Sequence, residues 1–172
     1  MSHVSLFESE NEELQVRCLP ALQKSCERLG LELVKQNNYR TWKSDHGSFV
    51  GDYPVPEGYD AKDLGENAEY VVRVAGLSDT ARTQKNAPYE VGVVKSQKNP
   101  GSYAFMYDFY AGGNGLEEKC GDKAGKLLMH YRMECDRITA EEQGDEITFR
   151  EQPDGTWLGV SDVDEDRVRE GE

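Results

Sequence analysis

Three stretches in the middle of the chain alternate between apolar and polar residues, and each predicts a β-strand. They span residues 69–75, 89–96 and 102–110. Alternation with a period of two places one set of side chains on a single face of a half-buried strand. The turn-forming Asn99-Pro100-Gly101 separates the second and third stretches, so these two are expected to form a hairpin. The residues on the more apolar face are Tyr70, Val72, Val74, Tyr89, Val91, Val93, Tyr103, Phe105, Tyr107 and Phe109.

Two other stretches repeat apolar residues at the three- and four-residue spacing typical of amphipathic helices. The first begins near Pro20, which fits a first helical position because that position needs no N–H. It ends near Leu29, and Gly30 follows as a helix-ending residue. The second helix lies within residues 121–144. Its apolar face consists of Ala124, Leu127, Leu128, Tyr131, Cys135 and Ile138.

Shorter signals complete the pattern of alternating helices and strands. A hairpin is expected near the end of the chain, with its turn at Pro153-Asp154-Gly155. A long surface loop is expected over residues 44–67, which are rich in Gly, Asp and Pro. Further short strands are predicted at residues 3–8, 31–35 and 39–42.

These elements predict a single α+β domain over residues 1–160. Its antiparallel sheet should carry two helices mainly on one face, as in a ferredoxin-like sandwich or a variant of it. Residues 161–172 form an acidic tail with six acidic residues and two arginines. This composition predicts a disordered end to the chain.

The chain is strongly acidic, with a formal net charge of −13. Nucleic-acid binding depends on Lys and Arg that displace counterions from phosphates, so this charge argues against DNA or RNA as a partner. It is compatible with a basic protein partner. The sequence contains no apolar run long enough to span a membrane and begins without a basic segment followed by an apolar one. We therefore expect a cytoplasmic protein that does not enter a membrane.

The cysteines and histidines give no sign of a metal site. Cys18, Cys26, Cys120 and Cys135 contain no C-x-x-C pair, and a cytoplasmic chain is expected to keep them as free thiols. Cys26 and Cys135 fall on apolar helix faces and are expected to be buried, whereas Cys120 lies in a Gly-rich segment and is expected to be the most exposed. His130 and Cys135 are five residues apart and lie on different helix faces, which disfavours zinc. Neither a metal nor a cofactor is expected.

One segment of the long loop brings together residue types that often contact ligands. Asp45 and His46 are flanked by Ser44 and Ser48. Adjacent residues do not form a catalytic triad, because a triad is assembled in space from separate segments. We interpret the segment as a polar loop with potential ligand contacts. Residues 121–127 are similar to a phosphate-binding loop, but they have three residues between the glycines and a Leu after the final Lys.

Several short motifs resemble those of a family of uncharacterised proteins. They are Met1-Ser2-His3, the helix from Leu22 to Gly30, Tyr89-Glu90-Val91-Gly92-Val93, Ser102-Tyr103-Ala104-Phe105, the helix through Tyr131, Gly144, and Asp154-Gly155. In this order the chain resembles domain of unknown function 1257, which includes the hypothetical chloroplast open reading frame 35 proteins. The resemblance covers most of the chain, but the acidic tail and the long loop depart from the family pattern. It implies an α+β fold and carries over no enzymatic activity.

Three hypotheses for function follow from the sequence. The first is a non-catalytic protein-interaction or regulatory module that uses an open face of the sheet, with Tyr103 and Tyr107 as partner contacts, because the chain shows no clustered acid, base and nucleophile. The second is a small-ligand-binding protein or enzyme with a site between the 44–67 loop and the central hairpin, contacted by Asp45, His46 and Arg73. A third is an acidic inhibitor or decoy that occupies a basic site on its partner.

Overall fold

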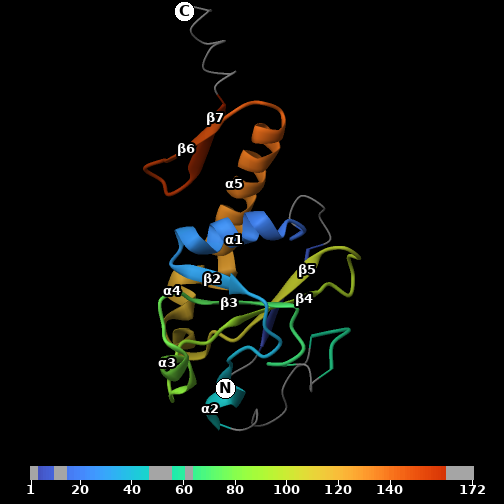
Figure 1. Ribbon diagram of the computed structural model, residues 1–172, viewed down its shortest axis with the longest axis vertical. Coiled ribbons are helices and arrows are strands. Elements are labelled where there is room, and N and C mark those ends of the chain that lie inside the picture. Colours follow the sequence, from blue (N-terminus) through green and yellow to red (C-terminus); the bar gives the residue numbers. More distant parts are fainter. Residues whose placement is uncertain (1–3, 10–14, 47–55, 61–63, 162–172) are drawn as a thin grey trace, which may run out of the picture.

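Five strands form one antiparallel sheet in the computed structural model, which describes residues 4–9, 15–46, 56–60 and 64–161 (Figure 1). The strands of this sheet are β1 (Ser5–Phe7), β2 (Leu31–Val34), β3 (Tyr70–Val74), β4 (Val91–Lys95) and β5 (Tyr103–Tyr107). A separate two-stranded sheet contains β6 (Ile147–Glu151) and β7 (Trp157–Ser161). The helices are α1 (Leu19–Arg28), α2 (Trp42–His46), α3 (Asp79–Thr83), α4 (Leu116–Cys120) and α5 (Gly125–Glu142), with short 3-10 segments η3 (Tyr110–Gly115) and η4 (Asp122–Ala124).

The predicted α+β class with an antiparallel sheet is confirmed. Strands β2 to β5 follow one another as a meander, and β1 closes the sheet beside β5. In a ferredoxin-like sandwich both helices connect strands of the same sheet. Here α1 does so, but α5 follows the last strand of the sheet and leads into the separate β6–β7 hairpin. The arrangement is therefore a variant of the predicted sandwich.

Helices α1 and α5 pack on one face of the sheet and cross each other there (Figure 1). Leu22 of α1 and Leu127 of α5 are fully buried against Phe105 of β5 and its neighbours. The Tyr131 hydroxyl of α5 accepts hydrogen bonds from the backbone N–H groups of Arg17 at 2.8 Å and Cys18 at 3.0 Å, just before α1. Burial raises the pKa of Tyr131 to about 12, so the hydroxyl stays protonated while it joins the two helices.

The other face of the sheet is also covered, although by irregular segments and not by helices. The buried side chains of Tyr39, Leu64 and Ala68 pack there against residues of β3, β4 and β5. Tyr39 lies directly over Gly92: a Cβ atom at Gly92 would stand 2.5 Å from the Tyr39 ring. Glycine at this position therefore permits the close approach of an aromatic ring to the sheet.

The strand predicted at residues 39–42 is wrong. Tyr39 lies on top of the sheet, so its backbone cannot also be part of the sheet. The Tyr39 N–H donates to Gly65 O at 3.0 Å, and the chain enters α2 at Trp42. The connection between β3 and β4 contains α3, which begins because the Ser78 side chain accepts a hydrogen bond from the Ala81 N–H at 3.1 Å.

A glycine-rich turn connects the end of β5 to α4. Five consecutive residues, 111–115, have positive φ angles between 52° and 107°. L-residues disfavour this left-handed conformation, which explains the three glycines in the segment. Gly113 O accepts the Tyr89 N–H at 2.9 Å, and the Asn114 side chain donates to Ala87 O at 3.0 Å. The turn therefore fixes the chain just before β4.

Cys120 is fully buried at the end of α4, so the prediction that it is the most exposed cysteine is wrong. The Gly-rich composition around it reflects the left-handed turn and does not indicate exposure. Cys26 is buried as predicted, and Cys135 is half-buried. Burial raises the pKa values of the Cys26 and Cys120 thiols to about 12, which disfavours the reactive thiolate.

The β6–β7 hairpin, with the predicted turn at residues 153–155, packs beside the far half of α5 (Figure 1). The Arg137 guanidinium lies over the Phe149 ring, 4.6 Å from its centroid. Arg137 also forms an ion pair with Glu134, which is 1% exposed and pairs with Arg28 of α1 as well.

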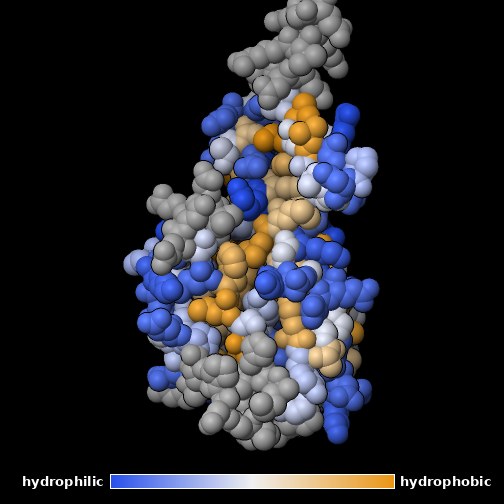
Figure 2. Space-filling view, turned by 180° about the vertical axis from the view of Figure 1, so that it is seen from behind, coloured by the Kyte–Doolittle hydropathy of each residue, from blue (hydrophilic) through white to orange (hydrophobic). Residues whose placement is uncertain are grey.

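Apolar residues form a broken strip along the long axis of the side seen in Figure 2. No helix among the described residues has the length and apolar character needed to cross a membrane.

Candidate functional site

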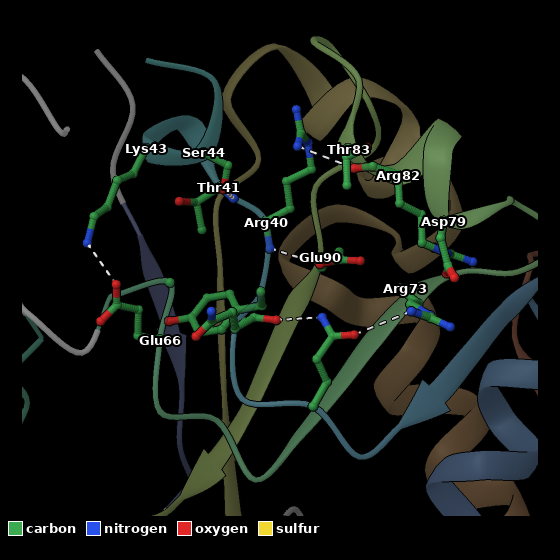
Figure 3. Close-up of a pocket in the computed structure, with 14 residues that line it drawn as sticks. Arg40, Thr41, Lys43, Ser44, Glu66, Arg73, Asp79, Arg82, Thr83 and Glu90 are labelled. Carbon is green, nitrogen blue, oxygen red and sulfur yellow. Dashed lines mark hydrogen bonds and ion pairs between the residues drawn. The ribbon is translucent and has the colours of Figure 1, made fainter. Parts of the chain in front are cut away.

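A polar pocket of about 440 Å³ lies on the face of the sheet opposite α1 and α5 (Figure 3). Strand β3 contributes Arg73, the residue just before β4 is Glu90, and α3 contributes Asp79, Arg82 and Thr83. The remaining wall comes from the connections around α2 and before β3. It consists of Gln36, Asn38, Tyr39, Arg40, Thr41, Lys43, Ser44, Gly65 and Glu66. We call this the arginine pocket.

The pocket gathers basic side chains although the whole protein is acidic. Its lining contains four basic residues and three acidic ones, whereas the chain carries a net charge of −13. In Figure 3, Glu90 lies between Arg40 on one side and Arg73 and Arg82 on the other. A cluster of guanidinium groups inside an acidic protein favours a ligand that bears negative charge.

Cross-strand pairing places the charged residues of the pocket floor. Glu32 of β2 is directly opposite Arg73 of β3, and Arg73 Nε donates to Glu32 Oε1 at 2.7 Å. Arg82 Nη2 from α3 donates to the same oxygen at 2.9 Å and to Val74 O at 2.7 Å. Extending the β3–β4 ladder by one step places Glu90 beside Arg73. The sheet thus presents acidic and basic side chains in a row.

Hydrogen bonds of Arg40 hold one wall of the pocket in place. Its guanidinium donates to the backbone carbonyls of Arg82 at 3.3 Å, Gln84 at 2.8 Å and Ala87 at 3.3 Å. Its backbone N–H donates to Glu90 Oε1 at 3.0 Å, and its carbonyl accepts the Glu90 N–H at 2.9 Å. Arg40 therefore connects the wall before α2 to α3 and to the start of β4.

Glu90 is 7% exposed, and its environment alters its protonation. Burial raises the pKa of Glu90, even though the Arg40 N–H and the nearby guanidinium groups favour the ionised carboxylate. The folded protein therefore binds the proton more tightly than the unfolded chain does. Glu90 thus adds stability at low pH, and this contribution is lost as the pH rises through its folded pKa. A carboxylate of this kind inside a pocket is a typical functional-site feature.

Two buried polar atoms of the pocket residues lack hydrogen-bond partners among the described residues. They are Thr41 Oγ1 and Arg82 Nε. Buried polar groups are nearly always hydrogen-bonded, and the exceptions often mark functional positions. Both atoms belong to side chains that line the same pocket.

The structure places the residues proposed from sequence in different parts of the molecule. Arg73 lines the arginine pocket, and its side chain is 20% exposed. Asp45 and His46 form the end of α2, directly after the pocket residues Lys43 and Ser44, but their side chains lie outside the described part of the structure.

The two tyrosines proposed as partner contacts lie in the helix-covered layer. Tyr107 is 5% exposed in the main apolar cluster, and Tyr103 is half-buried beside Tyr70, with ring centroids 6.1 Å apart. The opposite face is covered in part by Tyr39, Leu64 and Ala68. The described residues therefore offer no open sheet face at Tyr103 or Tyr107.

Sequence reasoning missed Arg40, Arg82 and Glu90 as site residues. Strand alternation contained part of the signal, since Arg73 and Glu90 both fall on the face opposite Val72 and Val91. Two charged residues on one face of adjacent central strands indicate a polar site on that face. Arg40 and Arg82 come from irregular chain and a short helix, where no period places a side chain.

Gly92 lies under the ring of Tyr39, which precedes the pocket residue Arg40, so packing at Gly92 should affect the pocket. The variant Gly92→Ala tests this. The added methyl group would collide with the buried Tyr39 ring, so Tyr39 and the adjoining Arg40 must move. We expect the free energy of unfolding to fall by about 1–3 kcal/mol and the Arg40 amide signal to shift, as measured by urea denaturation and NMR. Gly125→Ala is the control, because a Cβ at Gly125 meets nothing within 4 Å. Equal losses in both variants would contradict the coupling.

The described residues contain no group of three or more His, Cys, Asp or Glu side chains arranged to hold a metal ion. Comparisons of the chain with protein-family models, with curated proteins and with solved structures find no match. The resemblance to domain of unknown function 1257 therefore stays a prediction, and the geometry of the arginine pocket is the basis for assigning a function.

Proposed function

We propose that this chain is a small-ligand-binding protein whose ligand places an anionic group in the arginine pocket. One observation carries the proposal: Arg40, Arg73 and Arg82 surround a pocket of about 440 Å³ with Glu90 buried beside them. The volume lies within the range of small-molecule sites. The guanidinium groups supply donors for an oxyanion, and the Glu90 carboxylate supplies an acceptor for a hydroxyl or amine on the same ligand.

This proposal corresponds to the second of the three sequence-based hypotheses, with its site moved from the central hairpin toward β3 and α3. The burial of Tyr107 and the covered second face reduce the support for partner binding through an open sheet. The interaction-module and inhibitor hypotheses stay predictions.

Sulfate is a suitable probe, because it is a tetrahedral oxyanion that does not titrate near neutral pH. A titration of the ¹⁵N-labelled full chain is expected to shift amide signals of Arg40, Thr83 and Glu90. Arg73→Met keeps much of the side-chain length but removes the donors, and we expect sulfate affinity to fall about tenfold. Lys24→Met, an exposed charge on α1, is the matched control and should leave the affinity unchanged.

The pH dependence provides a second readout of the same titration. An anion bound beside Glu90 favours protonation of that carboxyl, so sulfate binding should strengthen as the pH falls toward the raised pKa of Glu90. Equal weakening by Arg73→Met and Lys24→Met, or shifts spread over the surface away from the pocket, would sink the proposal.

A further inference from the structure

Glu32 holds two of the pocket arginines with a single oxygen. Arg73 Nε and Arg82 Nη2 both donate to Glu32 Oε1, at 2.7 Å and 2.9 Å. Neither arginine donates to Oε2. The geometry resembles the binding of an external oxyanion by two guanidinium groups, except that the carboxylate belongs to the protein itself.

The two arginines retain donor capacity in this arrangement. A guanidinium has five N–H donors in a fork that matches the paired oxygens of a carboxylate or phosphate. Arg82 Nε is buried without a partner among the described residues. The bonds of Arg73 to the described residues use Nε and Nη1, the latter toward Gln36 Oε1 at 3.3 Å. Because both arginines share one oxygen of Glu32, each guanidinium group keeps N–H donors that have no acceptor among the described residues.

The exposed fractions of the side chains indicate whether Glu32 or the two arginines can leave these ion pairs. The Glu32 side chain is 36% exposed, whereas those of Arg73 and Arg82 are 20% and 11% exposed. Glu32 can therefore swing into solvent, while the arginines stay in place through their bonds to Gln36 Oε1 and Val74 O. Ion pairs with a partly exposed partner contribute about 0–1 kcal/mol each, so replacing Glu32 does not require a large compensating interaction.

We infer that Glu32 is an internal stand-in for the anionic group of the ligand, which an incoming carboxylate or phosphate displaces from Arg73 and Arg82. The inference rests on the proposed function and adds both a ligand class and a mode of regulation. Binding exchanges one carboxylate for another oxyanion with two or more oxygens, so weak or monodentate anions do not displace Glu32 from the two arginines. Any change that draws Glu32 away from the arginines should open the site.

Two variants that remove the same charge distinguish this exchange from a general electrostatic effect. Glu32→Gln removes the charge that holds both arginines, whereas Glu66→Gln removes the charge of a pocket-lining carboxylate that pairs, among the described residues, with Lys43 at 3.7 Å. With inorganic phosphate and acetate as separate probes in NMR titrations, we expect Glu32→Gln to tighten binding about 3- to 10-fold. Glu66→Gln should change the affinity about twofold or less. The probe that binds more tightly identifies phosphate or carboxylate as the ligand group.

A measurement on the unsubstituted protein tests the same exchange without depending on whether the variants fold. The side-chain carboxyl ¹³C signal of Glu32 should move toward its solvent-exposed value as the probe fills the pocket. If both probes bind the pocket but Glu32→Gln binds no more tightly than Glu66→Gln and the ¹³C signal does not move, the stand-in role is wrong and the ligand-binding proposal survives. If neither probe shifts any pocket signal in any of the three proteins, both proposals fail.

Discussion

Replacing Arg28 and Arg137 together with alanine is expected to lower the free energy of unfolding by about 3–5 kcal/mol. Both guanidinium groups donate to Oε1 of Glu134, whose side chain is only 2% exposed. Without them a carboxylate would remain buried between α1 and α5 with no compensating charge. Urea denaturation followed by circular dichroism measures the loss.

Two further variants show whether the loss comes from the buried charge. Adding Glu134→Met to the double variant replaces the carboxylate with an apolar side chain and should recover most of the stability. Arg132→Ala, at an exposed position of α5, should change the free energy of unfolding by about 0.5 kcal/mol or less. If the Glu134→Met addition recovers nothing, the arginines act through packing of their aliphatic stems, as in the Arg137 contact with Phe149, and not by compensating the charge of Glu134.

Leu127→Ala should destabilise the fold by about 2–5 kcal/mol, because it leaves a cavity in the layer between α5 and the sheet. Leu127 is fully buried in the cluster that contains Phe105 and Leu22. Leu158→Ala on the β6–β7 hairpin is the matched control, since Leu158 is 52% exposed and its loss should amount to about 0.5 kcal/mol or less. Similar urea midpoints for the two variants would mean that α5 does not cover the main core.

The helix-covered half of the fold could be predicted from the sequence because each of its elements has a clear period. The alternation at residues 69–75, 89–96 and 102–110 corresponds to β3, β4 and β5, and the helical spacing around Tyr131 corresponds to α5. The second face could not be predicted in this way. Its covering residues, such as Tyr39 and Leu64, come from irregular segments in which no repeat shows which side chain is buried.

The candidate site was only partly predictable for the same reason. Arg73 stands out as a charged residue in a central strand, and Glu90 is a charged residue of the next predicted strand, just before β4 begins. Their convergence with Arg40 depends on the path of the chain over Gly92, where the Tyr39 ring takes the place of a missing side chain. Contact between residues 50 positions apart, such as Arg40 and Glu90, leaves no local trace in a single sequence.

The unequal covering of the two sheet faces has an evolutionary consequence. Arg40, Lys43 and Glu66 lie in connections between strands, so substitutions or insertions there need not disturb the layer that α1 and α5 bury. Binding preference can drift while the architecture persists. Proteins that share this architecture would therefore differ in what they bind, and their ligands would have to be inferred one by one from the residues that replace these three.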